Sequence, residues 1–172
     1  MAHQAIQVLP RERIAIPSTV VSGAAEAVHV VLRAGAGVLF LQHGLQKTLG
    51  LLGGVDGTGA RAPLESLLGA AGLIETIGGL MLIIGLFTRP VAFILAGEMV
   101  TAYAMVHVQL GPWPIQNGGE LALLYAMIFL WLAAYGAGPL SVDHGMTRTI
   151  LLREVEEPVI AEHVRLHPPM QA

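Results

Sequence analysis

The stretch from Val31 to Gly50, VLRAGAGVLFLQHGLQKTLG, is apolar and long enough to cross a bilayer as a helix, yet it contains three ionisable side chains. At about 100° per residue, the side chains of Arg33, His43 and Lys47 fall within an arc of about 80° on one face. A charged group inside hydrocarbon costs about 2.5 to 3.5 kcal/mol on insertion scales. The other helices of the chain must therefore supply partners, or a polar cavity, for this face.

The composition is that of a membrane protein. Of the 172 residues, 54% are hydrophobic and only 12% are charged, about half the charged fraction of soluble domains. A soluble four-helix bundle is the alternative, but helices that are apolar nearly all round cannot be covered from water by so few charges. The apolar segments cover about residues 27–49, 67–87, 90–110 and 118–136.

These segments predict an all-α fold, an integral membrane four-helix bundle with antiparallel up-down topology, over residues 27–143. Short interfacial tails, 1–26 and 144–172, flank it. With four spans, both tails and the connection at 88–90 share one side of the membrane. We expect an inner (cell) membrane protein. The other side carries Lys47 and Arg61, whereas five arginines lie near the helix ends on the side of the tails: Arg11, Arg13, Arg89, Arg148 and Arg153. The positive-inside rule then predicts that both termini are cytoplasmic.

Several classes of function are excluded by what the chain lacks. It has no cysteine, which excludes disulfides, thiolate nucleophiles and iron–sulfur or cysteine–zinc ligation by this chain. No basic footprint for nucleic acid is present. The segment HGLQK has one imidazole and no second ligand at a suitable spacing, so no metal site is predicted.

The first expected layer of charges lies toward the cytoplasmic side. At about 1.5 Å rise per residue, Arg33 and Glu98 each lie about 10 Å from the cytoplasmic ends of their helices. We therefore expect Arg33 and Glu98 to form a structural ion pair. His107 is expected on the face of its helix opposite to Glu98. Gly37 and Gly44, together with Gly35, are small residues at which a second helix can approach closely.

The second expected layer lies toward the outer side and contains His43, Lys47, Glu75 and Glu120. One interpretation is a polar pocket, open to the outer leaflet, that holds a quinone headgroup or relays a proton to it, because a histidine near a carboxylate suits proton chemistry. The other interpretation is that these groups are internal ion pairs that fix the register of the helices. The residues alone leave both open.

The sequence resembles the DoxX family of small four-helix membrane proteins in three blocks, which together cover about residues 30–143. They are R-x-x-x-G-x-x-F followed by HGLQK, LIETIGGLMLIIGLFTRP, and NGGELALLYAMIFLWLAAYGAGPLSVD. The resemblance implies a subunit of a membrane redox complex near the quinone pool, since the family is named after a subunit of a thiosulfate:quinone oxidoreductase. The polar residues within the matching blocks are Arg33, His43, Lys47, Glu75 and Glu120.

The resulting hypothesis is a membrane subunit that interacts with quinone or anchors a soluble oxidoreductase partner. It has no covalently bound cofactor of its own, quinone is its expected ligand, and a redox protein is its expected partner. Whether the chain is itself an enzyme stays open. A non-catalytic membrane scaffold is one alternative. A small-solute or proton transporter is another, and it would need to form a homo-oligomer because four helices make a thin transporter.

Overall fold

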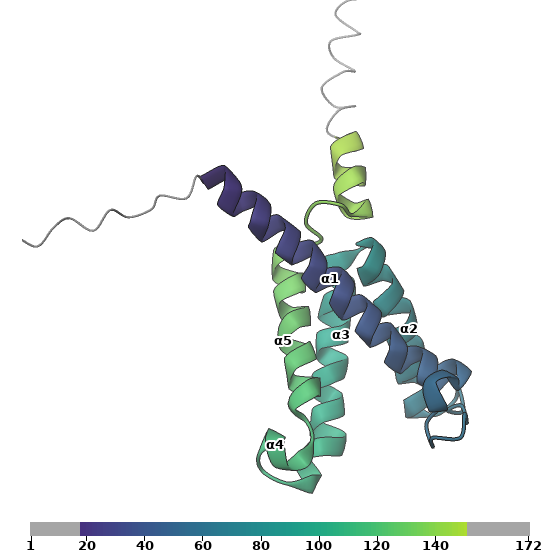
Figure 1. Cartoon of the computed structure of the whole chain (residues 1–172). Coiled ribbons are helices and arrows are strands. Elements are labelled where there is room, and N and C mark those ends of the chain that lie inside the picture. The colour runs from purple at the N-terminus through teal and green to yellow at the C-terminus, as the bar shows by residue number, and fades with distance from the viewer. Residues whose placement is uncertain (1–17, 151–172) are drawn as a thin grey trace, which may run out of the picture.

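The computed structural model describes residues 18–150, which form helices and connecting turns with no strand among them. The predicted all-α class is confirmed, while most of both predicted tails lies outside the described residues. Figure 1 shows the helices, and residues 142–150 form a further helical segment at the end of the described chain. The elements are α1 (Ser18–Leu49), η1 (Leu51–Gly53), α2 (Leu67–Ile84), α3 (Thr88–Ala102), the π-helix η2 (Tyr103–His107), η3 (Val108–Leu110), α4 (Pro114–Asn117) and α5 (Glu120–Tyr135).

Three helices in the described chain are long and apolar enough to cross a membrane: Ser22–Leu49, Leu67–Ile84 and Thr88–Leu110. The fourth predicted segment, 118–136, contains α5, which is apolar but has only 16 residues. At about 1.5 Å per residue, α5 rises about 24 Å, less than the ~30 Å of a hydrocarbon core. The structure is thus that of an integral membrane protein with three helices long enough to span the bilayer and one shorter apolar helix.

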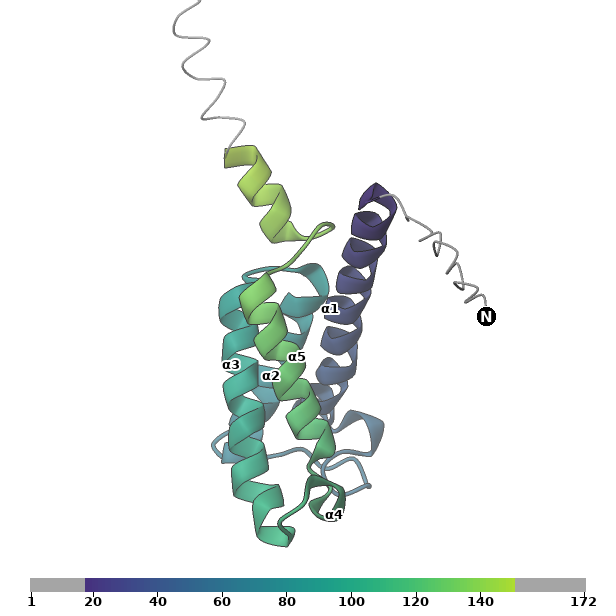
Figure 2. The same cartoon turned by 90° about the vertical axis from the view of Figure 1, so that its left-hand side faces the viewer.

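The helices are arranged as two antiparallel pairs. α1 packs along α2, and α3 packs along α5. The two pairs meet near the turn between α2 and α3 and diverge toward the opposite end (Figure 1). The start of α1 and the segment 142–150 both lie at the end with the α2–α3 turn, which Figure 2 shows from a second direction.

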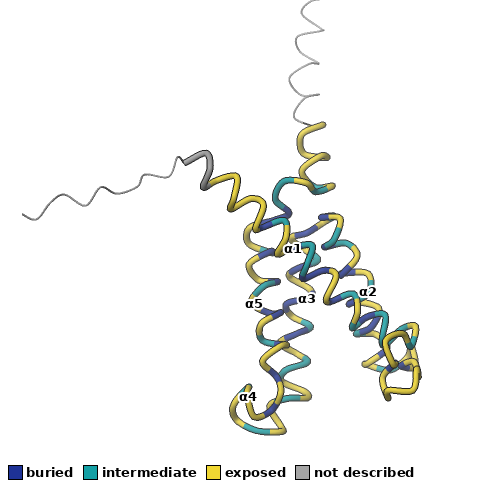
Figure 3. Tube along the Cα trace, viewed as in Figure 1, coloured by how far each residue is buried: buried dark blue, intermediate teal, exposed yellow. Residues whose placement is uncertain are grey.

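The core lies where the helices face one another, and Figure 3 shows that the outward faces are exposed. Phe40, Leu82 and Phe129 are among its most buried side chains. Leu80 and Phe93 are exposed, as expected for side chains that contact lipid rather than water.

Close packing of α1 on α2 depends on glycines. A Cβ added at Gly37 would lie 2.9 Å from the carbonyl oxygen of Gly79, and one added at Gly44 would lie 2.8 Å from the Cα of Thr76. Two of the three glycines that the sequence indicated, Gly37 and Gly44, therefore lie at the helix contact. Gly35 does not, because a Cβ there would meet nothing within 4 Å.

Arg33 holds the end of α2. Its guanidinium donates hydrogen bonds to the carbonyl oxygens of Leu82 (2.6 Å), Ile83 (3.0 Å) and Leu140 (2.9 Å). The last carbonyls of a helix lack partners within it and carry partial negative charge, so a buried arginine satisfies them well. Arg33 is only 1% exposed, and these bonds join α1, the end of α2 and the segment after α5.

The predicted ion pair between Arg33 and Glu98 is wrong. α1 begins at Ser18, nine residues before the predicted start at 27, and this places Arg33 level with the α2–α3 turn. Glu98 lies ten residues after Thr88, the first residue of α3, and therefore about 15 Å further along the helix axis. The ion pair that the described chain forms is the one between Lys47 and Glu75.

Asp143 caps the start of α3 and joins the end of the described chain to the α2–α3 turn. Its Oδ1 accepts from the backbone N–H of Phe87 and its Oδ2 from that of Thr88, both at 2.8 Å. Its own N–H donates to the carbonyl oxygen of Gly85 at 3.0 Å. An acidic side chain that satisfies the first N–H groups of a helix is a favourable cap.

We expect Asp143→Ala to lower the free energy of unfolding by about 1 to 2 kcal/mol, because the first N–H groups of α3 lose their acceptor. Thermal unfolding of the detergent-solubilised protein, followed by circular dichroism, measures this change. His144→Ala is the matched control, since the bond of His144 to Ser141 uses its backbone N–H. Equal unfolding temperatures for the two variants would contradict the capping role.

Candidate functional site

A cavity of about 840 Å³ lies between the two helix pairs, at the end away from the α2–α3 turn. Its walls come from α1, α2, α3, η2 and α5, and they are mostly apolar. Several apolar side chains that border it, including Leu67, Ile74 and Ile94, are also exposed on the surface of the bundle. The cavity therefore opens toward the lipid. The ionisable side chains that line it are His43, Lys47, Glu75, Glu98, His107 and Tyr125.

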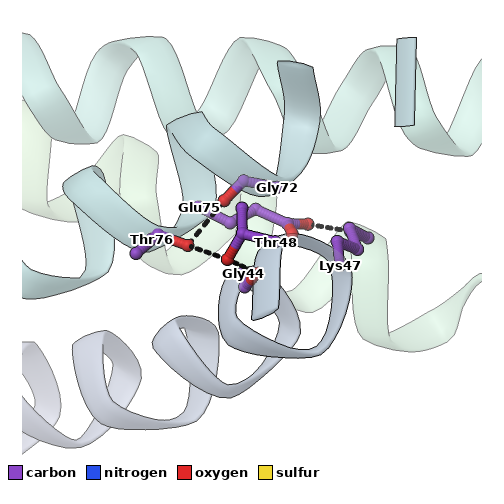
Figure 4. Close-up of polar contacts among 6 residues, drawn as sticks. All are labelled: Gly44, Lys47, Thr48, Gly72, Glu75 and Thr76. Carbon is purple, nitrogen blue, oxygen red and sulfur yellow. Dashed lines mark hydrogen bonds and ion pairs between the residues drawn. The ribbon is translucent and has the colours of Figure 1, made fainter. Parts of the chain in front are cut away.

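The charged end of the cavity is built around an ion pair between Lys47 of α1 and Glu75 of α2 (Figure 4). Lys47 Nζ donates to Glu75 Oε1. Glu75 is only 2% exposed, and its second oxygen, Oε2, has no hydrogen-bond partner within the described residues. A buried charge is tolerated when it is paired, so Lys47 allows Glu75 to lie at the wall of the cavity.

Two threonines secure the helix contact beside this pair (Figure 4). Thr48 Oγ1 donates to the carbonyl oxygen of Gly44 at 2.8 Å, and Thr76 Oγ1 donates to that of Gly72 at 2.7 Å. The two hydroxyl oxygens lie 3.4 Å apart. Of these contacts, the one between the two hydroxyl groups crosses from α1 to α2, and it lies beside Lys47 and Glu75.

Glu98 of α3 belongs to this site, although the sequence analysis placed it elsewhere. It lines the cavity, and the charges of Glu75 and Lys47 act on it. Both of its carboxyl oxygens are buried and have no hydrogen-bond partner within residues 18–150. The sequence held a signal for this placement: Glu75 lies ten residues before Gly85, and Glu98 lies ten residues after Thr88. An antiparallel hairpin therefore brings the two carboxyl groups to one level.

His43 lines the cavity on the α1 side, as the sequence predicted. Its ring lies edge-on to Tyr125, with centroids 6.3 Å apart, and at 6.4 Å from the ring of Phe40. These aromatic neighbours hold the imidazole between the polar and the apolar parts of the wall. Tyr125, which the sequence analysis did not single out, reaches the site from α5.

His107 also lines the cavity, although a regular helix would turn it away from Glu98. The reason is η2, a π-helix over Tyr103–His107. A π turn contains an additional residue, and it changes the direction in which the following side chains point. The Nδ1 atom of His107 lies 3.0 Å from the carbonyl oxygen of Asn117, which orients the ring.

Glu120 does not join the predicted pocket. It is exposed at the first position of α5 and is absent from the cavity wall. This position suits an acidic side chain because a helix N-terminus carries partial positive charge. Of the four residues predicted to form one site, the structure brings His43, Lys47 and Glu75 together and leaves Glu120 outside.

No group of three or more histidine, aspartate or glutamate side chains within the described residues is arranged to hold a metal ion. The side chains of the cavity offer chemistry of their own. It has a cation at Lys47, carboxyl groups at Glu75 and Glu98, an imidazole at His43, and an apolar wall that opens toward lipid. This arrangement suits a lipophilic molecule with a small polar head.

Comparison with known proteins agrees with the membrane character of the fold. The DoxX family model matches residues 28–108. A Haemophilus influenzae protein named "Uncharacterized protein" is 44% identical over 117 residues, which cover 66% of this chain and 86% of the relative. A Bacillus subtilis protein named "Putative oxidoreductase CatD" is 28% identical over 114 residues, or 66% of this chain and 83% of the relative. The chain matches no solved structure at a significant level.

Proposed function

The chain belongs to the DoxX family of integral membrane proteins, and on that premise we propose that it is the membrane subunit of a redox complex whose cavity binds a quinone. The observation that carries this proposal is the cavity itself, which has an apolar wall open toward lipid and one end lined by Lys47, Glu75, Glu98 and His43. Ligand sites of this kind combine apolar walls with a few convergent polar groups.

A quinone fits both parts of this cavity. Its ring and isoprenoid chain are apolar and reach the protein through the bilayer, which the exposed rim at Leu67, Ile74 and Ile94 permits. Its carbonyl oxygens accept hydrogen bonds, for which the ammonium of Lys47 and the imidazole of His43 are suitable donors. The similarity to the relative named "Putative oxidoreductase CatD" supports redox chemistry for this chain.

In this proposal a soluble partner protein supplies the electrons, and the membrane subunit positions the quinone and its protons. Arg89, beside the α2–α3 turn, and Arg148, in the last helical segment, lie at the end of the bundle opposite to the cavity. On the sequence-based prediction that both termini are cytoplasmic, that end faces the cytoplasm. The cavity then lies in the outer half of the membrane.

We expect the protein in lipid nanodiscs to bind a short-chain ubiquinone analogue, and we expect His43→Ala and Glu75→Gln each to weaken binding at least about ten-fold, which corresponds to about 1.4 kcal/mol. His43→Ala removes a hydrogen-bond donor from the cavity wall, and Glu75→Gln removes the negative charge that holds Lys47 there. Equilibrium dialysis against the analogue measures the dissociation constant.

Glu120→Gln is the matched control for this experiment, because it makes the same change as Glu75→Gln at an exposed position outside the cavity. It should bind the analogue as the wild type does. The proposal fails if the wild type binds no quinone analogue, or if His43→Ala and Glu75→Gln both bind it as tightly as the wild type.

A further inference from the structure

The cavity contains more carboxyl oxygens than its cation can satisfy. Lys47 contacts Oε1 of Glu75, whereas Glu75 Oε2 and both oxygens of Glu98 are buried and have no hydrogen-bond partner within residues 18–150. The exposed fraction of Glu75 is only 2%, so this residue is almost completely buried. A buried carboxyl group with no hydrogen-bond donor nearby is either protonated or part of a site in which a bound ligand supplies the donor.

The charges around Glu98 favour its protonated form. One cation, Lys47, faces two carboxyl groups in this cavity, and the contact with Glu75 already occupies it. An ionised Glu98 would be a second negative charge beside Glu75, without a counter-ion and in mostly apolar surroundings. The titratable groups that share the cavity with Glu98 are His43 and Lys47 of α1, Glu75 of α2, His107 of η2 and Tyr125 of α5.

The structure assigns different roles to the two carboxyl groups: Glu75 is the ionised partner of Lys47, and Glu98 holds a proton at neutral pH and offers it to the cavity as a hydrogen-bond donor. The group that Glu98 meets on a ligand is therefore an acceptor oxygen, such as the carbonyl of a quinone. The contact of Glu98 with a ligand oxygen rests on the proposed function, whereas the protonation of Glu98 does not.

A pH dependence of binding follows from this assignment. A carbonyl ligand accepts a hydrogen bond from protonated Glu98, but it faces a negative charge once Glu98 has ionised. Binding should therefore be strong at neutral pH and weaken as alkaline pH removes the proton. In Glu98→Gln the amide group donates at every pH, so binding should stay close to that of the wild type at neutral pH and lose its pH dependence.

Infrared spectroscopy of the ligand-free protein in nanodiscs tests the proton directly. We expect a carboxylic acid C=O stretching band at neutral pH that disappears at alkaline pH. This band should be absent in Glu98→Gln and retained in Glu120→Gln, whose substituted carboxyl group is exposed. The assignment is overturned if the wild type has no such band at neutral pH. That result would mean that Glu98 is ionised, for example with a protonated His43 as its counter-ion. It is also overturned if the band persists in Glu98→Gln.

Binding of the short-chain ubiquinone analogue across the pH range tests the contact with the ligand. Glu98→Leu should bind at least ten-fold more weakly than the wild type, and Glu98→Gln should give a flat pH profile. The contact is refuted if Glu98→Leu binds as the wild type does, or if Glu98→Gln keeps the wild-type pH profile. Should Glu98→Leu not fold, the profile of Glu98→Gln decides. If the wild type binds no quinone but the infrared band behaves as expected, the proposed function fails and the protonated Glu98 stands.

Discussion

Gly44→Val is expected to lower the free energy of unfolding by about 3 kcal/mol, because it forces α1 away from α2. A Cβ at this position would lie 2.8 Å from the Cα of Thr76, and backbone atoms cannot move aside as a flexible side chain would. Lys47 is the next residue of the same helix face. The displacement should therefore also separate Lys47 from Glu75 and abolish binding of the quinone analogue.

Gly35→Ala is the matched control for Gly44→Val, since it lies in the same helix and its new Cβ would meet nothing within 4 Å. Replacing a helical glycine by alanine gains up to about 1 kcal/mol of helix propensity, so this variant should be as stable as the wild type or more so. Unfolding by titration with a denaturing detergent, followed by circular dichroism, compares the two. Similar unfolding curves for Gly44→Val and Gly35→Ala would refute the close packing of α1 on α2.

The helices and their tight contact could be read from the sequence because both leave a local pattern. Long apolar runs mark spanning helices, and Gly37 and Gly44 lie on one face of the first of them. No such pattern in the sequence marks the start of α1. Residues 22–28 are exposed in the structure, so no buried face gives them a helical periodicity, and the depth of Arg33 was misjudged as a result.

The candidate site was predictable where it depends on charges within apolar segments, as at His43, Lys47 and Glu75. It was not predictable where it depends on departures from regular geometry. His107 reaches the cavity through a π-helix, which a period of 3.6 residues does not describe. Glu98 was assigned to the wrong partner because its depth was compared with that of Arg33 instead of being counted from the α2–α3 turn.

Lys47→Met is expected to lower the free energy of unfolding by about 3 to 5 kcal/mol under conditions that keep Glu75 ionised, because it leaves a buried carboxylate without its partner. The double variant Lys47→Met, Glu75→Gln removes both charges and should recover most of this loss. A double-mutant cycle of unfolding free energies measures the coupling between the two side chains. Additive effects of the two substitutions would contradict an energetically important ion pair.

The same double variant separates the two interpretations of the ion pair. If Lys47 and Glu75 only fix the register of α1 on α2, a stable double variant should bind the quinone analogue as tightly as the wild type. If they form the polar end of a ligand site, the double variant should fold and still bind at least about ten-fold more weakly, because no cation then faces the carbonyl oxygen of the quinone. In the first case the double variant recovers both stability and quinone binding. In the second case it recovers stability but not binding, and this second result is the one that we expect.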